Sequence, residues 1–126
     1  LKLKELSYTH AEGYPAGEMK HGPLALIENG MPVVVLAPRD KYYSKIISNM
    51  QEVIARGAKV LLITNKSKDE VVSENIWETI EVENINDDLI PFFLTIPMQK
   101  LAYYTALKKG YDIDKPRNLA KSVTVE

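Results

Sequence analysis

Apolar residues gather into two uninterrupted runs along the chain, and each run is rich in branched aliphatic side chains and bounded by turn-forming residues. The first run is Pro32–Pro38 and the second is Lys59–Asn65. Runs of this length and composition predict strands that are buried on both faces, as in a parallel sheet. A shorter and more polar alternating run, Thr79–Asn84, predicts a third strand nearer the edge of that sheet.

A segment whose apolar residues follow a helical period lies between the first two runs. Asp40 is placed to cap the N-terminus of this helix, and Gly57 is placed to end it. The apolar residues on its buried face are Ile46, Ile47, Met50, Val53 and Ile54. Strand, helix and strand in succession form a βαβ unit, which should cross over with a right hand.

Helices are also predicted near both ends of the chain. Leu1–His10 should continue a helix, with Leu3 and Leu6 on one face. Asp87–Leu107, with Asp87 as its N-cap, is apolar nearly all round, which indicates burial or an interface. Pro97 should kink this helix and Gly110 should end it.

The connecting segments are less regular. The stretch "AEGYPAGEMKHGP" contains three Gly and two Pro, and it predicts a loop with at most a short helical turn. "PLALI" predicts a brief apolar helical turn. "SKDEVVSENIW" leaves a short helix and an irregular link both open.

Composition narrows the functional classes. The 126 residues are 45% apolar and 26% charged with a net charge of −1, which is typical of one globular domain. Basic residues form no stripe for nucleic acid, and no run approaches the roughly 20 apolar residues of a membrane span. The absence of Cys excludes disulfides and thiol nucleophiles, and it favours a cytoplasmic location. A start without Met or a capping residue predicts a fragment of a longer polypeptide.

Several polar groupings could carry chemistry, and each also has a structural interpretation. A metal set of His10, Glu12, Glu18 and His21 has little support, because no H-E-x-x-H spacing occurs. No nucleophile elbow or P-loop is present. The segment "TNKS", at the carboxyl end of the second strand, is either a ligand-binding loop or a hydrophilic turn.

Four single residues stay open at this level. Lys2 and Glu5 are either a solvated ion pair or a carboxylate base held beside an ammonium group. His21 is either a structural loop residue or a proton shuttle. Lys121 is either ordinary surface charge or a nucleophile.

Two stretches, "GEMKHGPLALI" and the terminal "DKPRNLAKSVTVE", resemble the glutamine:fructose-6-phosphate aminotransferase (isomerising) family, the glucosamine-6-phosphate synthases. "LKLKE", "MPVVVLAP" and "NMQEVIARGAKV" fall in the expected order, so the resemblance covers essentially the whole chain. The tail is its most specific part, because KHGP-type loops occur throughout sugar isomerase domains.

The resemblance implies an α/β fold with three layers, α/β/α, around a doubly wound parallel sheet of the sugar isomerase (SIS) type. The chain would be most of the second of two such domains, truncated at its N-terminus. Residues 1–112 would form this partial domain and residues 113–126 a catalytic tail. The glutaminase domain, the first SIS domain and the loops that hold the sugar phosphate would be missing.

The resemblance also implies roles for five residues. Glu5 would move the proton between C1 and C2 of the open-chain sugar, with Lys2 nearby. His21 would assist ring opening and reach the active site of a neighbouring subunit, so the enzyme would be a homodimer. Lys121 would form a Schiff base with the C2 carbonyl, and Ala120 would lie against the sugar.

The implied reaction converts fructose 6-phosphate and glutamine to glucosamine 6-phosphate and glutamate without a metal or an organic cofactor. The fragment alone should be inactive, because the phosphate-binding half is absent. Two other interpretations are a non-catalytic phosphosugar-binding SIS module and a dimerisation fragment.

Overall fold

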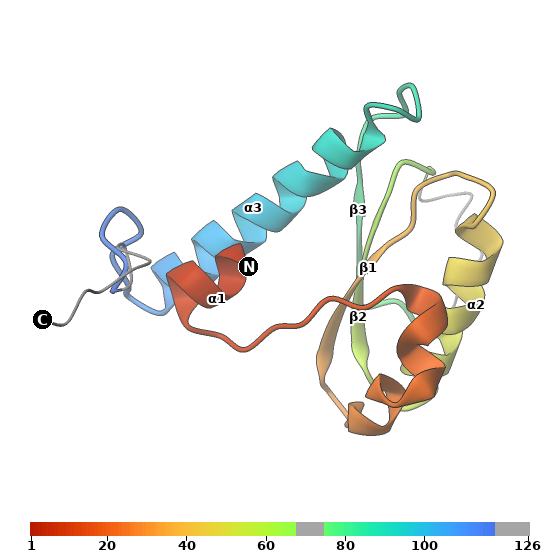
Figure 1. The fold of residues 1–126 in the computed structure, drawn as a ribbon, viewed down its shortest axis with the longest axis horizontal. Coiled ribbons are helices and arrows are strands. Elements are labelled where there is room, and N and C mark those ends of the chain that lie inside the picture. Colours follow the sequence, from red (N-terminus) through yellow and green to blue (C-terminus); the bar gives the residue numbers. More distant parts are fainter. Residues whose placement is uncertain (68–74, 118–126) are drawn as a thin grey trace, which may run out of the picture. The chain divides into compact units, whose positions relative to one another are not determined.

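The computed structural model describes residues 1–67 and 75–117, which form two compact units (Figure 1). Unit 1 comprises Leu1–Gly13 together with the chain from Ile96 onward. Unit 2 comprises Tyr14–Thr95 and contains the sheet. Each unit is described separately below.

The sheet of unit 2 has three parallel strands in the order β1-β2-β3. These are β1 (Pro32–Leu36), β2 (Lys59–Thr64) and β3 (Glu78–Glu81). In the register of the pairs, Val34 lies opposite Leu61, and Ile63 lies opposite Ile80. The parallel sheet and the α/β class that the sequence predicts are therefore confirmed.

Burial differs between the two strongly apolar strands. Val60, Leu62 and Ile63 of β2 are completely buried, as predicted. In β1 no residue is buried, and Leu36 is 41% exposed. The prediction that β1 is buried on both faces is therefore wrong for the described residues, because β2 takes the central position of this sheet and β1 has a neighbour on one side only.

Helix α2 (Tyr43–Ile54) packs its predicted apolar face into the core of unit 2, and all five predicted residues take part. Asp40 is not its N-cap, because the helix begins three residues later. Its Oδ1 instead accepts the N–H of Tyr42 at 2.7 Å, which forms the turn that leads into the helix. The predicted stop is confirmed, since Gly57 has a φ of 88° and its N–H bonds the carbonyl of Ile54.

Two short 3₁₀ helices follow the start of unit 2, η1 (Ala16–His21) and η2 (Pro23–Leu26). η1 lies against α2 and η2 lies against η1, on the same side of the sheet as α2 (Figure 1). Met19 and Leu24 join the core there. The "KHGP" segment is thus the junction of two packed helical turns, and it is more regular than the predicted loop.

Helix α1 (Lys2–Ser7) is shorter than predicted, because Tyr8 adopts a left-handed conformation with a φ of 53°. Helix α3 (Ile90–Lys108) begins three residues after Asp87, so the predicted N-cap is wrong. Asn86 accepts the N–H of Asp88 in the preceding turn. Pro97 lies inside α3, and Gly110, with a φ of 74°, ends it as predicted.

Helix α3 is apolar on most of its surface, but much of that surface is exposed. Phe92 is 68% exposed and Tyr104 is 58% exposed. Burial within the described residues therefore does not account for the apolar surface of α3. The prediction that this helix forms an interface remains. None of the helices in the two described ranges is long and apolar enough to span a membrane.

Candidate functional site

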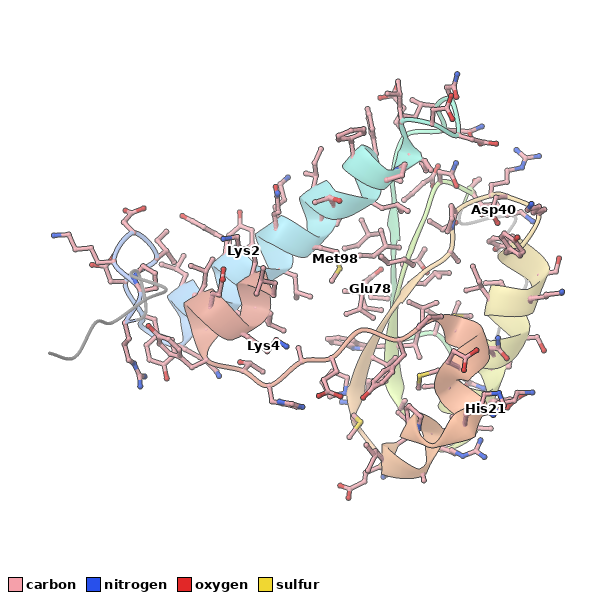
Figure 2. The ribbon with its side chains drawn as sticks, viewed as in Figure 1. Lys2, Lys4, His21, Asp40, Glu78 and Met98 are labelled. Carbon is pink, nitrogen blue, oxygen red and sulfur yellow. The ribbon has the colours of Figure 1, made fainter. Side chains whose placement is uncertain are left out.

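Lys2 and Glu5 lie one turn apart on α1 and form an ion pair, with Lys2 Nζ 2.9 Å from Glu5 Oε2. Lys2 projects from the helix (Figure 2), and its side chain is 63% exposed, whereas that of Glu5 is 27% exposed. An exposed pair at this spacing stabilises a helix by only about 0.2–0.5 kcal/mol. The geometry therefore places a partly sheltered carboxylate beside an ammonium group.

An open hollow of about 360 Å³ adjoins this pair within unit 1. Its walls come from α1 and α3 and are mainly apolar. They are formed by Lys2, Leu6, Gln99, Lys100 and Tyr103. Lys2 and Lys100 therefore both line the hollow, and Lys2 is also ion-paired with Glu5.

The end of α1 is fixed by three hydrogen-bonded residues, Ser7, Thr9 and Lys109, which we name the polar node. Ser7 is completely buried, and its hydroxyl donates to the carbonyl of Leu3 at 2.7 Å. Lys109, just beyond α3, donates from Nζ to the Ser7 carbonyl at 3.1 Å and to Thr9 Oγ1 at 2.7 Å. The helix that carries Glu5 is thus held to the end of α3 by hydrogen bonds between segments about 100 residues apart in sequence.

A second contact set, which we name the tail clamp, consists of Tyr8, Tyr111 and Arg117. The two tyrosine rings meet edge to face with centroids 4.8 Å apart. The Arg117 guanidinium carbon lies 3.9 Å from the centroid of Tyr8 and 5.5 Å from that of Tyr111. The backbone N–H of Arg117 donates to the Tyr8 hydroxyl at 2.7 Å. The beginning of the predicted tail is therefore attached to the residue that ends α1.

A turn brings the chain back to this clamp. Asp112 Oδ1 accepts the N–H groups of Asp114 and Lys115 at 2.9 Å and 3.1 Å. This is an Asx-type turn, in which a short carboxylate side chain replaces a backbone acceptor. The predicted residues Ala120 and Lys121 lie outside the described residues, which in this part of the chain end at Arg117.

His21 belongs to unit 2, where it is the last residue of η1, and its side chain is exposed (Figure 2). In the described part of the chain no hydrogen bond or ion pair engages its imidazole. Its backbone position is nevertheless well supported. Lys20 Nζ lies 2.6 Å from Glu52 Oε1 of α2, and Met19 packs on the core. The structure thus presents an unengaged imidazole from a supported turn.

Hydrogen bonds account for the first two residues of "TNKS". The Thr64 hydroxyl donates to the carbonyl of Ala37 at 2.6 Å. Asn65 accepts the N–H of Arg39 at 2.6 Å and donates to Asn84 at 3.2 Å. These two buried side chains tie the carboxyl ends of the three strands together. Thr64 and Asn65 therefore have a structural role, because their buried polar groups already have hydrogen-bond partners.

The metal interpretation gains no support. His10 Nε2 lies 3.6 Å from Glu12 Oε1, but both side chains are largely exposed. Over residues 1–67 and 75–117, no group of three or more acidic or His side chains could hold a metal ion.

Sequence reasoning missed Tyr8 and Lys109, which fix the end of α1 in unit 1, and Glu52, which supports the turn of His21 in unit 2. Their contacts join segments far apart in the chain, and no local spacing announces them. The sequence gives no sign of the left-handed end of α1 at Tyr8, because that position holds neither Gly nor Asn.

The comparisons with known proteins agree with this architecture. The SIS domain family model matches residues 1–109. Glutamine--fructose-6-phosphate aminotransferases [isomerizing] from Brucella abortus and Bartonella henselae are 56% and 55% identical to this chain over all 126 residues. The chain spans 21% of the length of these relatives.

Solved structures give the same result. The C-terminal domain of glucosamine-fructose-6-phosphate aminotransferase from Francisella tularensis has a TM-score of 0.84 and 47% identity, covering 90% of this chain and 32% of that one. A glucosamine-6-phosphate deaminase from Thermotoga maritima has a TM-score of 0.68 and 28% identity, covering 98% of this chain and 34% of that one. The chain belongs to the SIS domain family.

Proposed function

We propose that this chain is the C-terminal isomerase portion of an enzyme that converts fructose 6-phosphate and glutamine to glucosamine 6-phosphate and glutamate. The observation that carries the proposal is 56% identity over all 126 residues to curated proteins named for that aminotransferase activity. Residues 1–112 would form part of an SIS domain, and residues 113–126 would be the catalytic tail.

In this proposal Glu5 transfers the proton between C1 and C2 of the open-chain sugar. A single carboxylate can act first as base and then as acid on one face of the intermediate, and a positioned group of this kind contributes about 10² to 10⁴ in rate. The 2.9 Å contact with Lys2 supports this role, because it fixes the direction of the carboxylate on α1 and because Lys2 lines the adjacent hollow. Lys2 would be a substrate-binding residue.

Lys121 would form the Schiff base with the C2 carbonyl, with Ala120 against the sugar. The amine adds to the carbonyl carbon and water leaves; ammonia then adds to the iminium carbon and the Lys121 amine leaves, which gives a 2-imino sugar whose C1–H bonds are acidic enough for Glu5. The attachment of Arg117 to the end of α1 supports this assignment, because Lys121 follows Arg117 by only four residues.

His21 would assist opening of the sugar ring by proton transfer to the ring oxygen. Its exposure on a supported turn suits a group that serves a site outside its own unit. We propose that it reaches the active site of a second copy, which makes the homodimer part of the catalyst.

The remaining parts of the proposal concern the rest of the enzyme. A glutaminase domain and a first SIS domain would supply ammonia and the phosphate-binding loops, and the location would be cytoplasmic. No metal or organic cofactor is needed for the steps above. The 126-residue chain alone should not turn over sugar phosphate, because phosphate binding energy could not position the reacting carbons.

The test uses the full-length enzyme with Lys121→Ala and, as a matched tail control, Lys115→Ala. Borohydride reduction in the presence of fructose 6-phosphate should trap a covalent sugar adduct in the parent and in Lys115→Ala, and none in Lys121→Ala. An undiminished adduct in Lys121→Ala would remove the Schiff-base role. Sugar-phosphate binding by the parent without any turnover would favour a non-catalytic binding module instead.

A further inference from the structure

Helix α1 is too short to hold a direction by itself, so contacts from the rest of unit 1 must supply it. It spans only Lys2–Ser7, whereas isolated helices shorter than about 12–15 residues are marginal in water. It lies beside the C-terminal half of α3 (Figure 1). Ser7, its last residue, is completely buried, and its hydroxyl donates to the carbonyl of Leu3 on the same face. This face of α1 is therefore the anchored one.

Lys109, one residue beyond the end of α3, provides the anchor. Its Nζ donates to the Ser7 carbonyl at 3.1 Å and to Thr9 Oγ1 at 2.7 Å. A cation at the C-terminus of a helix bonds the free carbonyls there and interacts favourably with the helix dipole. Hydrogen bonds from a charged donor are also about twice as strong as neutral ones. Lys109 thus fixes the end of a six-residue helix to the end of a 19-residue helix.

Helix geometry couples Glu5 to this anchor. Glu5 lies two residues before Ser7, which places the two side chains about 200° apart around the helix axis. Burial agrees, because Ser7 is completely buried whereas the Glu5 side chain is 27% exposed. Turning α1 by about 20° around its axis would move the end of a side chain by about 2 Å. Misplacing a catalytic group by about 1 Å can cost about 10² in rate, so the anchor at Ser7 matters for Glu5.

We propose that Lys109 is a positioning residue for Glu5, and that it acts by holding the Ser7 end of α1 so that the carboxylate is directed at C1 of the sugar. This inference rests on the proposed function, in which Glu5 transfers the proton between C1 and C2. Lys109 neither touches the sugar nor exchanges a proton with it. Its role differs from that of Lys2, which contacts the Glu5 carboxylate directly at 2.9 Å.

Lys109→Met in the full-length enzyme tests the inference, because it removes the donor and keeps an unbranched side chain. We expect kcat to fall about tenfold with KM unchanged, because proton transfer slows while sugar binding is intact. In a single turnover, the borohydride-trapped adduct should form at the parent rate, and glucosamine 6-phosphate should appear about tenfold more slowly. Deuterium at C1 of fructose 6-phosphate should slow product formation further. A slow step that does not respond to this deuterium would overturn the inference.

Two further variants separate positioning from a purely structural role. Lys108→Met removes the preceding exposed lysine and should keep the parent rate. Lys109→Arg keeps a charged donor and should bring product formation back to within about threefold of the parent. A purely structural role predicts instead that glutamine hydrolysis, the amount of adduct and thermal stability fall together with product formation. That outcome, or a failure of Lys109→Arg to recover the rate, would contradict the positioning role.

Thr9→Val keeps the inference testable if Lys109→Met folds poorly. It removes one of the two acceptors of the Lys109 ammonium group and keeps the shape of the side chain. We expect the same pattern at a smaller size, with product formation about threefold slower and adduct formation unchanged. Thr9→Ser keeps the hydroxyl acceptor and is the matched control, with product formation expected at the parent rate.

The outcomes separate this inference from the function on which it rests. If Glu5→Gln slows product formation as the proposed function requires while Lys109→Met and Thr9→Val keep the parent rate, Lys109 has no positioning role and the role of Glu5 stands. If Glu5→Gln forms product at the parent rate, the proposed role of Glu5 fails, and the inference fails with it.

Discussion

The two units of this chain are stabilised in different ways. Unit 2 contains a contiguous apolar core between its sheet and α2, in which Val60 and Leu62 are completely buried. Unit 1 has few buried apolar residues, and those on its part of α3 are small: Ala102 and Ala106. Its segments are joined instead by hydrogen bonds from Lys109 and by the tail clamp.

Because of this difference, we expect unit 2 to supply most of the stability and unit 1 to carry the proposed chemistry. Apolar burial is the larger and less directional source of stability, and it needs no specific chemical partner. Hydrogen bonds and ring stacking contribute less, but they fix directions and distances. Unit 1, which carries Glu5 and the predicted tail, is built from the directional contacts. Substitutions in unit 1 should therefore affect rate more than stability, and substitutions in the core of unit 2 the reverse.

The largest effect is expected for Glu5→Gln in the full-length enzyme. Loss of the proton-transfer group should lower kcat by about 10² to 10⁴, while the lost surface ion pair should change the free energy of unfolding by at most about 0.5 kcal/mol. Steady-state kinetics and urea unfolding measure the two quantities. Glu83→Gln, at an exposed position of unit 2, is the control. The contrast between the two units would fail if Glu5→Gln lost enough stability to account for its lower kcat.

Leu62→Ala should have the largest effect on stability. The side chain is completely buried in the central strand, so its truncation leaves a cavity and should lower the free energy of unfolding by about 2–5 kcal/mol. Urea unfolding followed by circular dichroism measures it. The control is Leu36→Ala, since that side chain is 41% exposed and should cost much less. Equal losses at the two positions would contradict the assignment of the core to β2.

A smaller effect is expected for Lys109→Met, which breaks the polar node of unit 1. The buried Ser7 and its neighbour Thr9 lose a charged donor, which should lower stability by about 1 kcal/mol. Hydrogen exchange should speed up in α1, and the core strands of unit 2 should keep their protection. Lys108→Met, one position earlier, is the matched control. Equal changes in both variants would show that the node contributes nothing beyond surface charge.

The smallest effect concerns Lys20 and Glu52, the ion pair that supports the turn carrying His21. Both side chains are partly exposed, so a double-mutant cycle of Lys20→Met and Glu52→Gln should give a coupling energy of about 0–1 kcal/mol. Raising the salt concentration should reduce it. A coupling well above this range would mean that unit 2 also depends on directional contacts, which would weaken the comparison.

Part of the site could be read from the sequence alone. The spacing of Lys2 and Glu5 predicted their ion pair, because residues three apart face each other on a helix. The apolar face of α2 was predicted residue by residue for the same reason. Gly57 and Gly110 predicted the ends of their helices, since both adopt the positive φ that other residues avoid.

Other features were decided by tertiary structure. The caps predicted at Asp40 and Asp87 were wrong, because each helix begins after a further turn stabilised by side-chain acceptors. "TNKS" could be interpreted as a structural turn only after Ala37, Arg39 and Asn84 were found beside it. Local spacing carries no information about such partners.

The sequence by itself determined the α/β class, the order of the parallel strands along the chain and the family, because these depend on periodicity and on recognisable motifs. Only the tertiary structure decided where the C-terminal segment is attached. That attachment joins Tyr8 to Arg117 across 109 positions of sequence, and it depends on a left-handed tyrosine that closes α1. The physical reason is that side-chain contacts form by proximity in space, which chain folding creates and local pattern does not encode.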